Sequence, residues 1–563
     1  MIYHCEDHTC NYWDEGEKLP ERCPQCGRKL LRANEADMTG DDWTALGNTL
    51  WDAEASDKKR MVDCFRKAAY LGSAWGVCNL GICMEQGNGV EADPVQAFWL
   101  YQQAVEMGSL NAVCCLGVCY QYGIGTAPDA EKAAELYCKA AEYGSPRGQM
   151  LLARAFHDGI GVEADAAEAV HWVRAAAYQR YGEGMYRLGV CYEYGDGVEQ
   201  NWEHAVHWFR EAAESGVSVA MTDLGYCYEK GCGVEQSWEQ AFSWYRRGAE
   251  CGYPVSMSNL GLCYKRGYGV EQNWQEAIKW YEQGAQCGDL QSMHNLARCY
   301  ERGEGVEQNE DRALYWYRRG AEAGSDYCMY CLGWNYSNGE GVEQNMTEAI
   351  RWYTAAAEGG NADAMHNLGW LYDHGEGVEQ DMKKAICWYE RAAEQNHPAA
   401  MNSLGECYAM GRGVPRDLET AMEWYRRAAE LGEAMADYNM GWHLEQAGKL
   451  SEAYAHYRKA ADGNDDSAWW ALGRFYENGV VVAQDGKEAR RCYETGEKLG
   501  SVKCKMRLAR CKLLGIGGRR EKKAGLDLCR QALELAKESS EKEDYGYEAE
   551  MNLLRRTIAE NES

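Results

Sequence analysis

Residues 224–252, LGYCYEKGCGVEQSWEQAFSWYRRGAECG, decide the fold of this chain. Leu224, Cys227 and Tyr228 stand at i, i+3 and i+4, which is the spacing of one stripe on a helix and not the alternation of a strand. The glycines of the segment 231–233 interrupt this stripe, because glycine adopts the positive φ angle of a tight turn without steric cost. A second apolar stripe follows, made of a Trp-Tyr pair and spaced alanines. The stretch therefore predicts a helical hairpin.

The same hairpin is repeated along most of the chain. We use the leucine of its Leu-Gly pair as a phase residue, and this residue recurs every 36 positions. The strict series comprises Leu80, Leu116, Leu152, Leu188, Leu224, Leu260, Leu296, Leu332, Leu368, Leu404 and Met440. Leu46, Leu472 and Leu508 extend it at spacings of 34, 32 and 36 residues. Because one hairpin cannot bury its own aromatic residues, we expect about fourteen hairpins to stack and share a continuous core.

Capping residues recur in register with the phase residue. Thirteen residues after it, side chains that can accept from free N–H groups mark the start of each second helix. These residues are Asp93, Asp129, Asp165, Asn201, Ser237, Asn273, Asn309, Asn345, Asp381 and Asp417. Glycines are expected to end the second helices, namely Gly108, Gly144, Gly216, Gly252, Gly288, Gly324, Gly360 and Gly432. The recurrent Trp-Tyr pairs are then interpreted as packing residues and not as a ligand cage.

Composition narrows the function classes. The 59 basic and 88 acidic residues give a net charge of −29. Such a field repels phosphate backbones, which argues against nucleic acid as a general partner and leaves only a local basic patch open. The sequence starts with polar, cysteine-bearing residues unlike a signal peptide, and it has no apolar stretch of about 18 residues that would span a membrane. These features predict a cytoplasmic protein.

The 26 cysteines follow the repeat. Many occupy the position three residues after the phase residue, where a small apolar side chain faces the partner helix. These are Cys83, Cys119, Cys191, Cys227, Cys263, Cys299, Cys407 and Cys511. A separation of one repeat is too wide for designed disulfides, so the cysteines predict a reducing compartment.

The unit Leu-Gly-x-Cys-Tyr-x-x-Gly-x-Gly-Val-Glu-Gln-Asn, followed by Ala-x-x-Trp-Tyr and Ala-Ala-Glu-x-Gly, resembles the Sel-one-like repeat family. Members are relatives of tetratricopeptide repeats with a longer turn inside each hairpin. The resemblance covers roughly residues 40–530. It implies an all-α fold, an α/α solenoid wound as a right-handed superhelix, and a scaffolding role without enzymatic activity. The unit around Met440 departs from the pattern, because its turn is shortened.

Three regions are expected from these patterns. Residues 1–33 form a zinc-ribbon-like module, and residues 34–514 form a solenoid of about thirteen to fourteen repeats. Residues 515–563, rich in Lys, Glu and Arg and without the Trp-Tyr pair, form capping helices whose polar outer face protects the last core layer.

The N-terminal cysteines have the spacing of a metal site. Cys5, Cys10, Cys23 and Cys26 form a C-x4-C…C-x2-C set, and the second pair is followed by a glycine that allows a tight knuckle. The segment resembles a zinc ribbon of two or three short strands, in which a structural zinc ion supplies the folding energy. His8 is the alternative to Cys10, because it completes a C-x2-H pair with Cys5. Four protein ligands leave no open coordination site for catalysis.

A partner surface is predicted on the first helix of each hairpin. The residues one before, two after and six after the phase residue lie at i, i+3 and i+7 and share one side, which we call the first-helix face. The predicted contact residues are Asn259, Arg266, Asn295, Arg298, Arg302, Trp334, Asn367 and Trp370. Asparagine can both donate to and accept from an extended peptide backbone. Arginines followed by tryptophans suit an acidic peptide that contains aromatic residues, and a merely solvated face is the alternative.

The sequence predicts a non-enzymatic scaffold or adaptor that binds a partner protein or peptide, acidic in character, along this face. It has no Gly-rich phosphate loop, no nucleophile elbow and no His-Glu-x-x-His, so neither catalysis nor a small-molecule substrate is expected. Two alternatives stay open. One is a zinc-ribbon regulatory adaptor that contacts nucleic acid or its enzymes, and the other is a bacterial effector delivered to a host cytosol.

Overall fold

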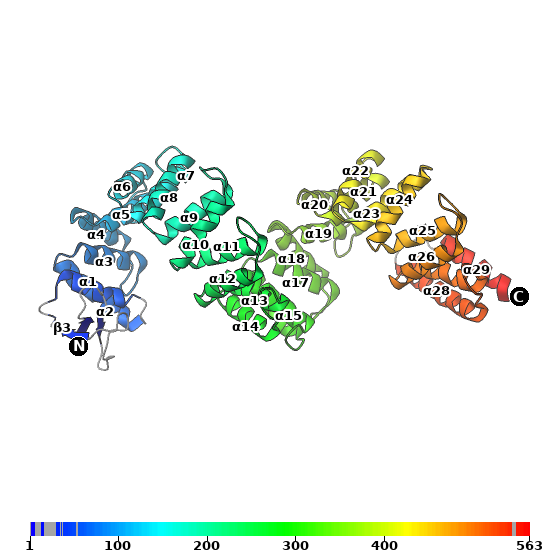
Figure 1. The fold of residues 1–563 in the computed structure, drawn as a ribbon, viewed down its shortest axis with the longest axis horizontal. Coiled ribbons are helices and arrows are strands. Elements are labelled where there is room, and N and C mark those ends of the chain that lie inside the picture. Colours follow the sequence, from blue (N-terminus) through cyan, green and yellow to red (C-terminus); the bar gives the residue numbers. More distant parts are fainter. Residues whose placement is uncertain are drawn as a thin grey trace. The chain divides into compact units, whose positions relative to one another are not determined.

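A computed structural model describes residues 2–5, 13–15, 30–33, 35, 38–51, 55–542 and 548–562. The chain divides into two compact units, Met1–Ser292 (unit 1) and Met293–Ser563 (unit 2). Within each unit, consecutive helices pair as hairpins, and each hairpin packs against the next (Figure 1). The predicted all-α solenoid of helical hairpins is therefore confirmed for the described residues.

The first helices of the hairpins carry odd numbers and the second helices carry even numbers. Unit 1 contains α1 (Gly40–Thr49), α2 (Ala55–Tyr70), α3 (Ala74–Gln86), α4 (Pro94–Glu106), α5 (Leu110–Tyr122), α6 (Ala130–Glu142), α7 (Pro146–Asp158), α8 (Ala166–Tyr178), α9 (Gly182–Tyr194), α10 (Trp202–Glu214), α11 (Ser218–Lys230), α12 (Trp238–Glu250), α13 (Pro254–Arg266) and α14 (Trp274–Gln286). Unit 2 contains most of α15 (Leu290–Arg302), then α16 (Glu310–Glu322), α17 (Asp326–Asn338), α18 (Met346–Glu358), α19 (Ala362–His374), α20 (Met382–Glu394), α21 (Pro398–Met410), α22 (Leu418–Glu430), α23 (Ala434–Gln446), α24 (Leu450–Asp462), α25 (Asp466–Asn478), α26 (Gly486–Lys498), α27 (Val502–Leu514), α28 (Lys522–Lys542) and α29 (Glu548–Glu562).

Three short strands precede the helices. They are β1 (Ile2–Cys5), β2 (Trp13–Glu15) and β3 (Leu30–Ala33), and they form an antiparallel sheet of order β2-β1-β3. The register pairs Tyr3 with Asp14 on one side and with Arg32 on the other. The segment expected to be a zinc ribbon thus contains three strands.

The Gly-x-Gly turn is explained by two different constraints. Gly231 ends α11 in the left-handed region, with φ of +75°. Gly233 also has a positive φ, and a Cβ atom there would lie 2.3 Å from the carbonyl oxygen of Trp202, in the second helix of the preceding hairpin. The first glycine therefore serves the turn, while the second lets successive hairpins approach each other closely.

Most hairpin cores are built around a contact that we call the ring pair. It consists of the glycine after the phase residue and an aromatic residue of the following helix, twenty positions later except for Phe65 and Tyr457, where the spacing is shorter. A Cβ atom on Gly225 would lie 2.6 Å from a ring carbon of Tyr245, so any side chain at this position would require the ring to shift. The Tyr245 hydroxyl donates to Glu229 Oε2 at 2.9 Å. The fully buried rings are Phe65, Tyr101, Tyr137, Phe209, Tyr245, Tyr281, Tyr317, Tyr353, Tyr389, Tyr425, Tyr457 and Tyr493.

The predicted helix boundaries are confirmed. All ten predicted N-cap side chains accept a hydrogen bond from a backbone N–H of the first turn, as Asn201 Oδ1 does from His204 at 3.0 Å. The eight predicted glycines have positive φ angles, such as +98° at Gly216. Each glycine directly follows the C-cap residue of a second helix, as Gly216 follows Ser215. This is the left-handed C-terminal motif that favours glycine.

The repeat cysteines pack as small apolar side chains. Cys83, Cys227 and Cys407 are free thiols with almost no exposed surface. Burial raises the pKa of the Cys83 thiol to about 11 and that of the Cys227 thiol to about 12, so both are neutral at physiological pH. Packing, and not reactivity, accounts for them.

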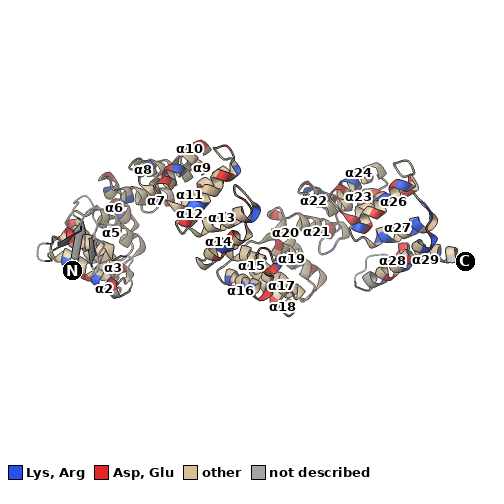
Figure 2. Cartoon of the chain, turned by 60° about the horizontal axis from the view of Figure 1, so that its bottom comes forward, with Lys and Arg blue, Asp and Glu red and all other residues tan. Residues whose placement is uncertain are grey.

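At the C-terminal end, α28 pairs with α27 as the second helix of a hairpin, and α29 packs against both. Arg507 on α27 donates to Glu550 on α29 at 2.7 Å, and both side chains are largely buried. Acidic and basic side chains are interspersed along the helices of both units (Figure 2). Among the described residues, no helix has both the length and the apolar character needed to cross a lipid bilayer.

Candidate binding surfaces on the first helices

Unit 2 exposes tryptophans on its first-helix face. Trp334 on α17, Trp370 on α19 and Trp442 on α23 all lie two residues after the phase residue, and 44%, 38% and 38% of their surfaces are exposed. The second-helix tryptophans of unit 2 are less exposed: Trp388, for example, is half-buried beneath the guanidinium group of Arg391, which lies 4.4 Å from its ring centroid. Because large exposed apolar side chains in register are a feature of interaction sites, the first-helix tryptophans are candidates for binding.

Two predicted basic residues lie on α15 of the same unit. Arg298 is half-buried and Arg302 is exposed. Neither forms an ion pair with any residue that the structure describes. Burial raises the pKa of the intervening Glu301, and the positive charges of Arg302 and Arg298 oppose that rise. Both guanidinium groups therefore retain donors for a carboxylate of a partner.

The other predicted contact residues are divided between the units. Asn259, which is half-buried, and Arg266, which is exposed, belong to unit 1. Asn295 and Asn367 are half-buried and belong to unit 2. The structure therefore places six of the eight predicted residues in unit 2 and two in unit 1.

Two further asparagines of the same position link neighbouring repeats. Asn79 donates to Asn48 Oδ1 at 2.8 Å, and Asn439 donates to Asn402 Oδ1 at 3.0 Å. Their acceptors lie on the preceding first helix. At these two positions the amide stabilises repeat stacking, so the recurrence of asparagine is not by itself a signature of peptide binding.

Unit 1 contains a cavity on the same face. The α7–α9 cavity has a volume of about 810 Å³ and is bounded by α7, α8 and α9. Ala153, Val170, Val173 and Val190 give it an apolar floor. It opens where exposed residues of the first-helix face line its rim, namely Arg154, Asp158, Arg187 and Tyr194. An apolar cavity of this size with a few convergent polar groups is typical of a binding site.

The cavity lies at a hairpin without a ring pair. Val173 stands where the preceding hairpin has Tyr137 and the following hairpin has Phe209, and Ala153 replaces the glycine. Without the ring, the space between the helices stays open. Ala297 and Tyr317 occupy the two ring-pair positions of the α15–α16 hairpin and are both buried, so the alanine alone does not exclude an aromatic residue.

A charged network lies on one side of the rim. His157 occupies the position at which Glu229 accepts the tyrosine hydroxyl in the α11–α12 hairpin. Its Nδ1 lies 2.8 Å from Asp158 Oδ1, and its Nε2 lies 3.2 Å from Asp196 Oδ2. The hydrogen bond with Asp158, reinforced by the charge of Asp196, raises the pKa of His157. Arg154 lies 3.3 Å from the same Asp158, so these charges largely neutralise one another.

Two arginines of the rim have no carboxylate partner among the described residues. Arg147 donates from Nη1 to Asn111 Oδ1 at 2.7 Å and to Cys115 Sγ at 3.6 Å. Arg187 forms neither a hydrogen bond nor an ion pair with the part of the chain that the structure describes. The rim therefore offers two cationic groups to an anionic ligand.

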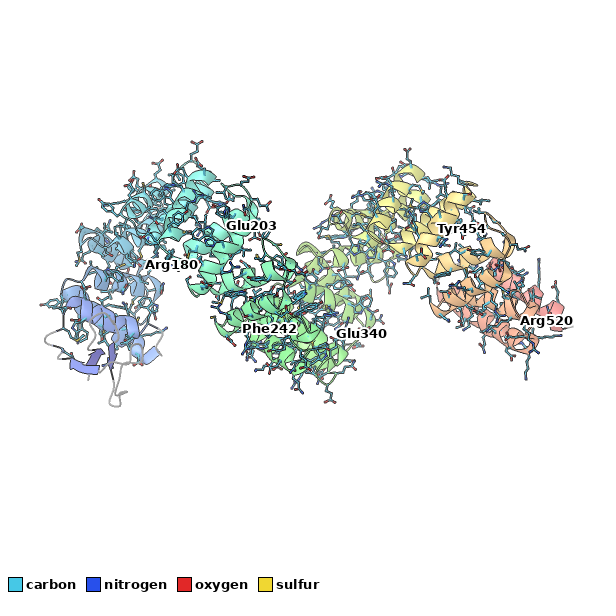
Figure 3. The ribbon with its side chains drawn as sticks, in the orientation of Figure 1. Arg180, Glu203, Phe242, Glu340, Tyr454 and Arg520 are labelled. Atoms are coloured by element: carbon cyan, nitrogen blue, oxygen red, sulfur yellow. The ribbon has the colours of Figure 1, made fainter. Side chains whose placement is uncertain are left out.

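The cavity opens on the predicted first-helix face, but at repeats other than those that carry the predicted contact residues. The signal was present, since Trp172-Val173 breaks the Trp-Tyr series and Ala153 breaks the Leu-Gly series in one hairpin. The turn that follows is unusual as well. Arg180, labelled in Figure 3, adopts φ of +58° at the position where most hairpins have glycine.

The predicted zinc site cannot be assembled from the described residues. Cys10, Cys23, Cys26 and the alternative ligand His8 lie outside them, and Cys5 is the last residue of β1. Within the described residues, no cluster of three or more His, Cys, Asp or Glu side chains is arranged to hold a metal ion.

Stacked helical hairpins with Gly-x-Gly turns, ring pairs and a variable first-helix face define an α-solenoid repeat protein, a class that binds along extended surfaces. The Sel1 repeat family matches most of the chain, and the chain belongs to this family. The matched segments are 76–109, 112–145, 146–181, 182–217, 218–253, 254–289, 290–325, 326–361, 362–397, 398–433, 434–465, 468–501 and 502–537.

Solved structures of the same family are similar to this chain. The protective antigen c5321 of uropathogenic Escherichia coli, described as displaying an SLR fold, is 30% identical, with a TM-score of 0.53 over 85% of this chain and 97% of that protein. A Sel1 repeat protein from Oxalobacter formigenes is 32% identical over 43% of this chain and 96% of that protein, with a TM-score of 0.40. A comparison with curated protein sequences gave no match.

Proposed function

We propose that this protein is a non-enzymatic scaffold that binds a partner polypeptide along the first-helix face. The exposure of Trp334, Trp370 and Trp442 at one repeat position carries the proposal. Tryptophan is enriched among residues that dominate binding energy, and its exposure here is not explained by packing, since the ring pairs already fill the hairpin cores.

The chemistry of the face favours an acidic partner that contains aromatic residues. Arg298 and Arg302 lie on α15 without ion pairs to described residues, in a chain whose net charge is −29. A carboxylate next to the tryptophans would be bound by guanidinium groups that do not first have to break an internal ion pair. Within unit 1, Asn259 and Arg266 offer an amide and a guanidinium group at the corresponding repeat positions.

The test compares two charge reversals of the full chain. Affinity capture followed by mass spectrometry identifies proteins bound by the natural chain, and the capture is repeated with the double variant Arg298→Glu/Arg302→Glu. The control Arg318→Glu/Lys383→Glu makes the same change at exposed positions of the second helices α16 and α20. We expect the first variant, but not the control, to lose a defined partner without a change in melting temperature. Equal capture by both variants would contradict the proposal.

We also propose that residues 1–33 hold a structural zinc ion through Cys5, Cys23 and Cys26, with Cys10 or His8 as the fourth ligand. The spacing of the two cysteine pairs supports this site. A segment this short has little apolar core, so the ion would stabilise its fold. Elemental analysis of the purified full chain is expected to find one zinc ion per molecule, and Cys23→Ser/Cys26→Ser is expected to remove it. A metal-free natural chain would exclude the site.

A further inference from the structure

The α7–α9 cavity includes the position that an aromatic ring occupies in the neighbouring hairpins. Tyr137 in α6 and Phe209 in α10 are fully buried at the position of Val173. The replacement removes the ring and leaves a floor of alanine and valine side chains, which have no polar atoms to satisfy. Such a floor favours an apolar, planar group from outside the chain.

The charges at the rim favour a ligand that carries a negative charge. Arg147 and Arg187 line the cavity from α7 and α9, and neither has a carboxylate partner in the described part of the chain. Of the other charged side chains that line the cavity, His157 and Arg154 are held by Asp158 and Asp196, and Glu183 accepts a hydrogen bond from the Tyr181 hydroxyl at 3.5 Å. An aromatic group with a carboxylate directed toward the two arginines would match both the floor and the rim.

The surroundings favour a polypeptide as the source of that group. The mouth lies on the first-helix face, and exposed tyrosines continue this face on the neighbouring first helices. Tyr122 on α5 is 58% exposed, Tyr194 on α9 is 73% exposed and Tyr226 on α11 is 45% exposed. An extended segment could therefore insert one ring into the cavity while its flanking residues contact these tyrosines.

We propose that the α7–α9 cavity receives an aromatic side chain of a partner polypeptide, next to an acidic residue that Arg147 and Arg187 bind. This inference rests on the proposed scaffold function and assigns to it a specific subsite in unit 1. The site is distinct from the tryptophans of unit 2, so the two can be tested apart.

The decisive variant restores the ring. Ala153→Gly/Val173→Tyr recreates the glycine–tyrosine pair of the other hairpins and should fold, because the same pair is accommodated throughout the array. Val173→Phe is a second filling variant, supported by the phenylalanine at residue 209. Phe209→Tyr is the matched control, since it changes the same position one hairpin later, where a ring is already present. Hydrogen exchange of α7 and α8 verifies that each variant is folded.

The probe is a library of short random peptides selected on the full natural chain. We expect the bound peptides to be enriched in an aromatic residue adjacent to Asp or Glu. Their affinity should fall about 30-fold in the filled variants, which is the effect of losing one anchoring side chain, and also in Arg187→Glu. It should not change in Phe209→Tyr.

Other outcomes overturn the inference in distinguishable ways. Peptides that bind the filled variants unchanged but lose affinity in Trp334→Ser/Trp370→Ser would support the scaffold function and refute the cavity subsite. Binding of 3-(4-hydroxyphenyl)propionate without binding of any peptide would show a small-molecule site and refute a polypeptide ligand. Failure to select any peptide, together with no partner in affinity capture, would refute both proposals.

Discussion

Two hairpins of unit 1 show that the same repeat can form either a closed core or an open cavity. In α11–α12, the Tyr245 ring lies over Gly225, its hydroxyl donates to Glu229, and the interior is closed. In α7–α8, Val173 and Ala153 replace the pair, and an open cavity results. The helix lengths do not differ, since each of these four helices spans thirteen residues.

The comparison shows why departures from a repeat are informative. In an array, each hairpin packs mainly on its neighbours, so the surrounding repeats define what stability alone requires at a position. A hairpin without the buried aromatic ring lacks packing energy that stabilises its neighbours. Such a hairpin is a candidate for function where, as beside Val173, a cavity takes the place of the ring.

The largest expected effect is loss of the ring where it is present. Tyr245→Ala should lower the local free energy of unfolding by about 3–5 kcal/mol, because it empties a fully buried site and removes the hydroxyl that donates to Glu229 Oε2. The matched change Val173→Ala should cost only about 1–2 kcal/mol, because fewer apolar contacts are lost beside an existing cavity. Native-state hydrogen exchange of α11–α12 and α7–α8 measures the two effects. Equal losses would show that the two hairpins are packed alike.

A second difference concerns two histidines on first helices. Burial, with a contribution from the charge of His397, lowers the pKa of His366 to about 4. The folded state therefore binds fewer protons than the unfolded state below about pH 6.5, and the stabilising contribution present above that pH is lost as the pH falls toward 4. The loss is at most about 3 kcal/mol, and His366→Phe should remove it.

His157 at the cavity should behave in the opposite way. Asp158 and Asp196 raise its pKa, so its contribution is full below about pH 6.5 and is lost as the pH rises through the folded-state value. Because His157 is exposed, this effect should be smaller than that of His366. Hydrogen exchange of α19 and of α7 across this pH range, in the natural chain and in His366→Phe and His157→Gln, gives the two signs. The same sign at both sites would contradict the assigned environments.

The sequence was sufficient for the hairpins and their ends because those features depend on local interactions. A cap such as Asn201 acts on a backbone group three residues away, and the ten-fold recurrence of the pattern removes ambiguity. Buried thiols such as Cys227 follow from the same periodicity.

The cavity and the role of two asparagines were not predicted, since they depend on tertiary contacts. The consequence of Val173 is visible only beside Ala153 on another helix, twenty residues earlier. Asn439 finds its acceptor on Asn402, 37 residues away on the preceding first helix. Periodicity places such residues on a face, but it does not show whether a neighbouring repeat or a partner satisfies them.

The smallest expected effect comes from the turn beside the cavity. Arg180 has φ of +58°, a left-handed conformation that costs a residue with a Cβ atom roughly 1–2 kcal/mol. Its ion pair with Glu211, at 3.4 Å, lies on the surface and offsets little of this cost. Arg180→Gly should therefore stabilise the α8–α9 junction by about 0.5–1 kcal/mol, after the greater chain entropy of glycine in the unfolded state is included.

The control is Asn396→Gly, at the equivalent turn of unit 2 with φ of +61°. It should give a smaller gain in stability, because asparagine tolerates this region better than arginine. Hydrogen exchange of the residues flanking each turn measures both changes. A larger gain at residue 396 than at residue 180 would show that Arg180 is held without strain, and the turn would then no longer distinguish the cavity-bearing hairpin from the others.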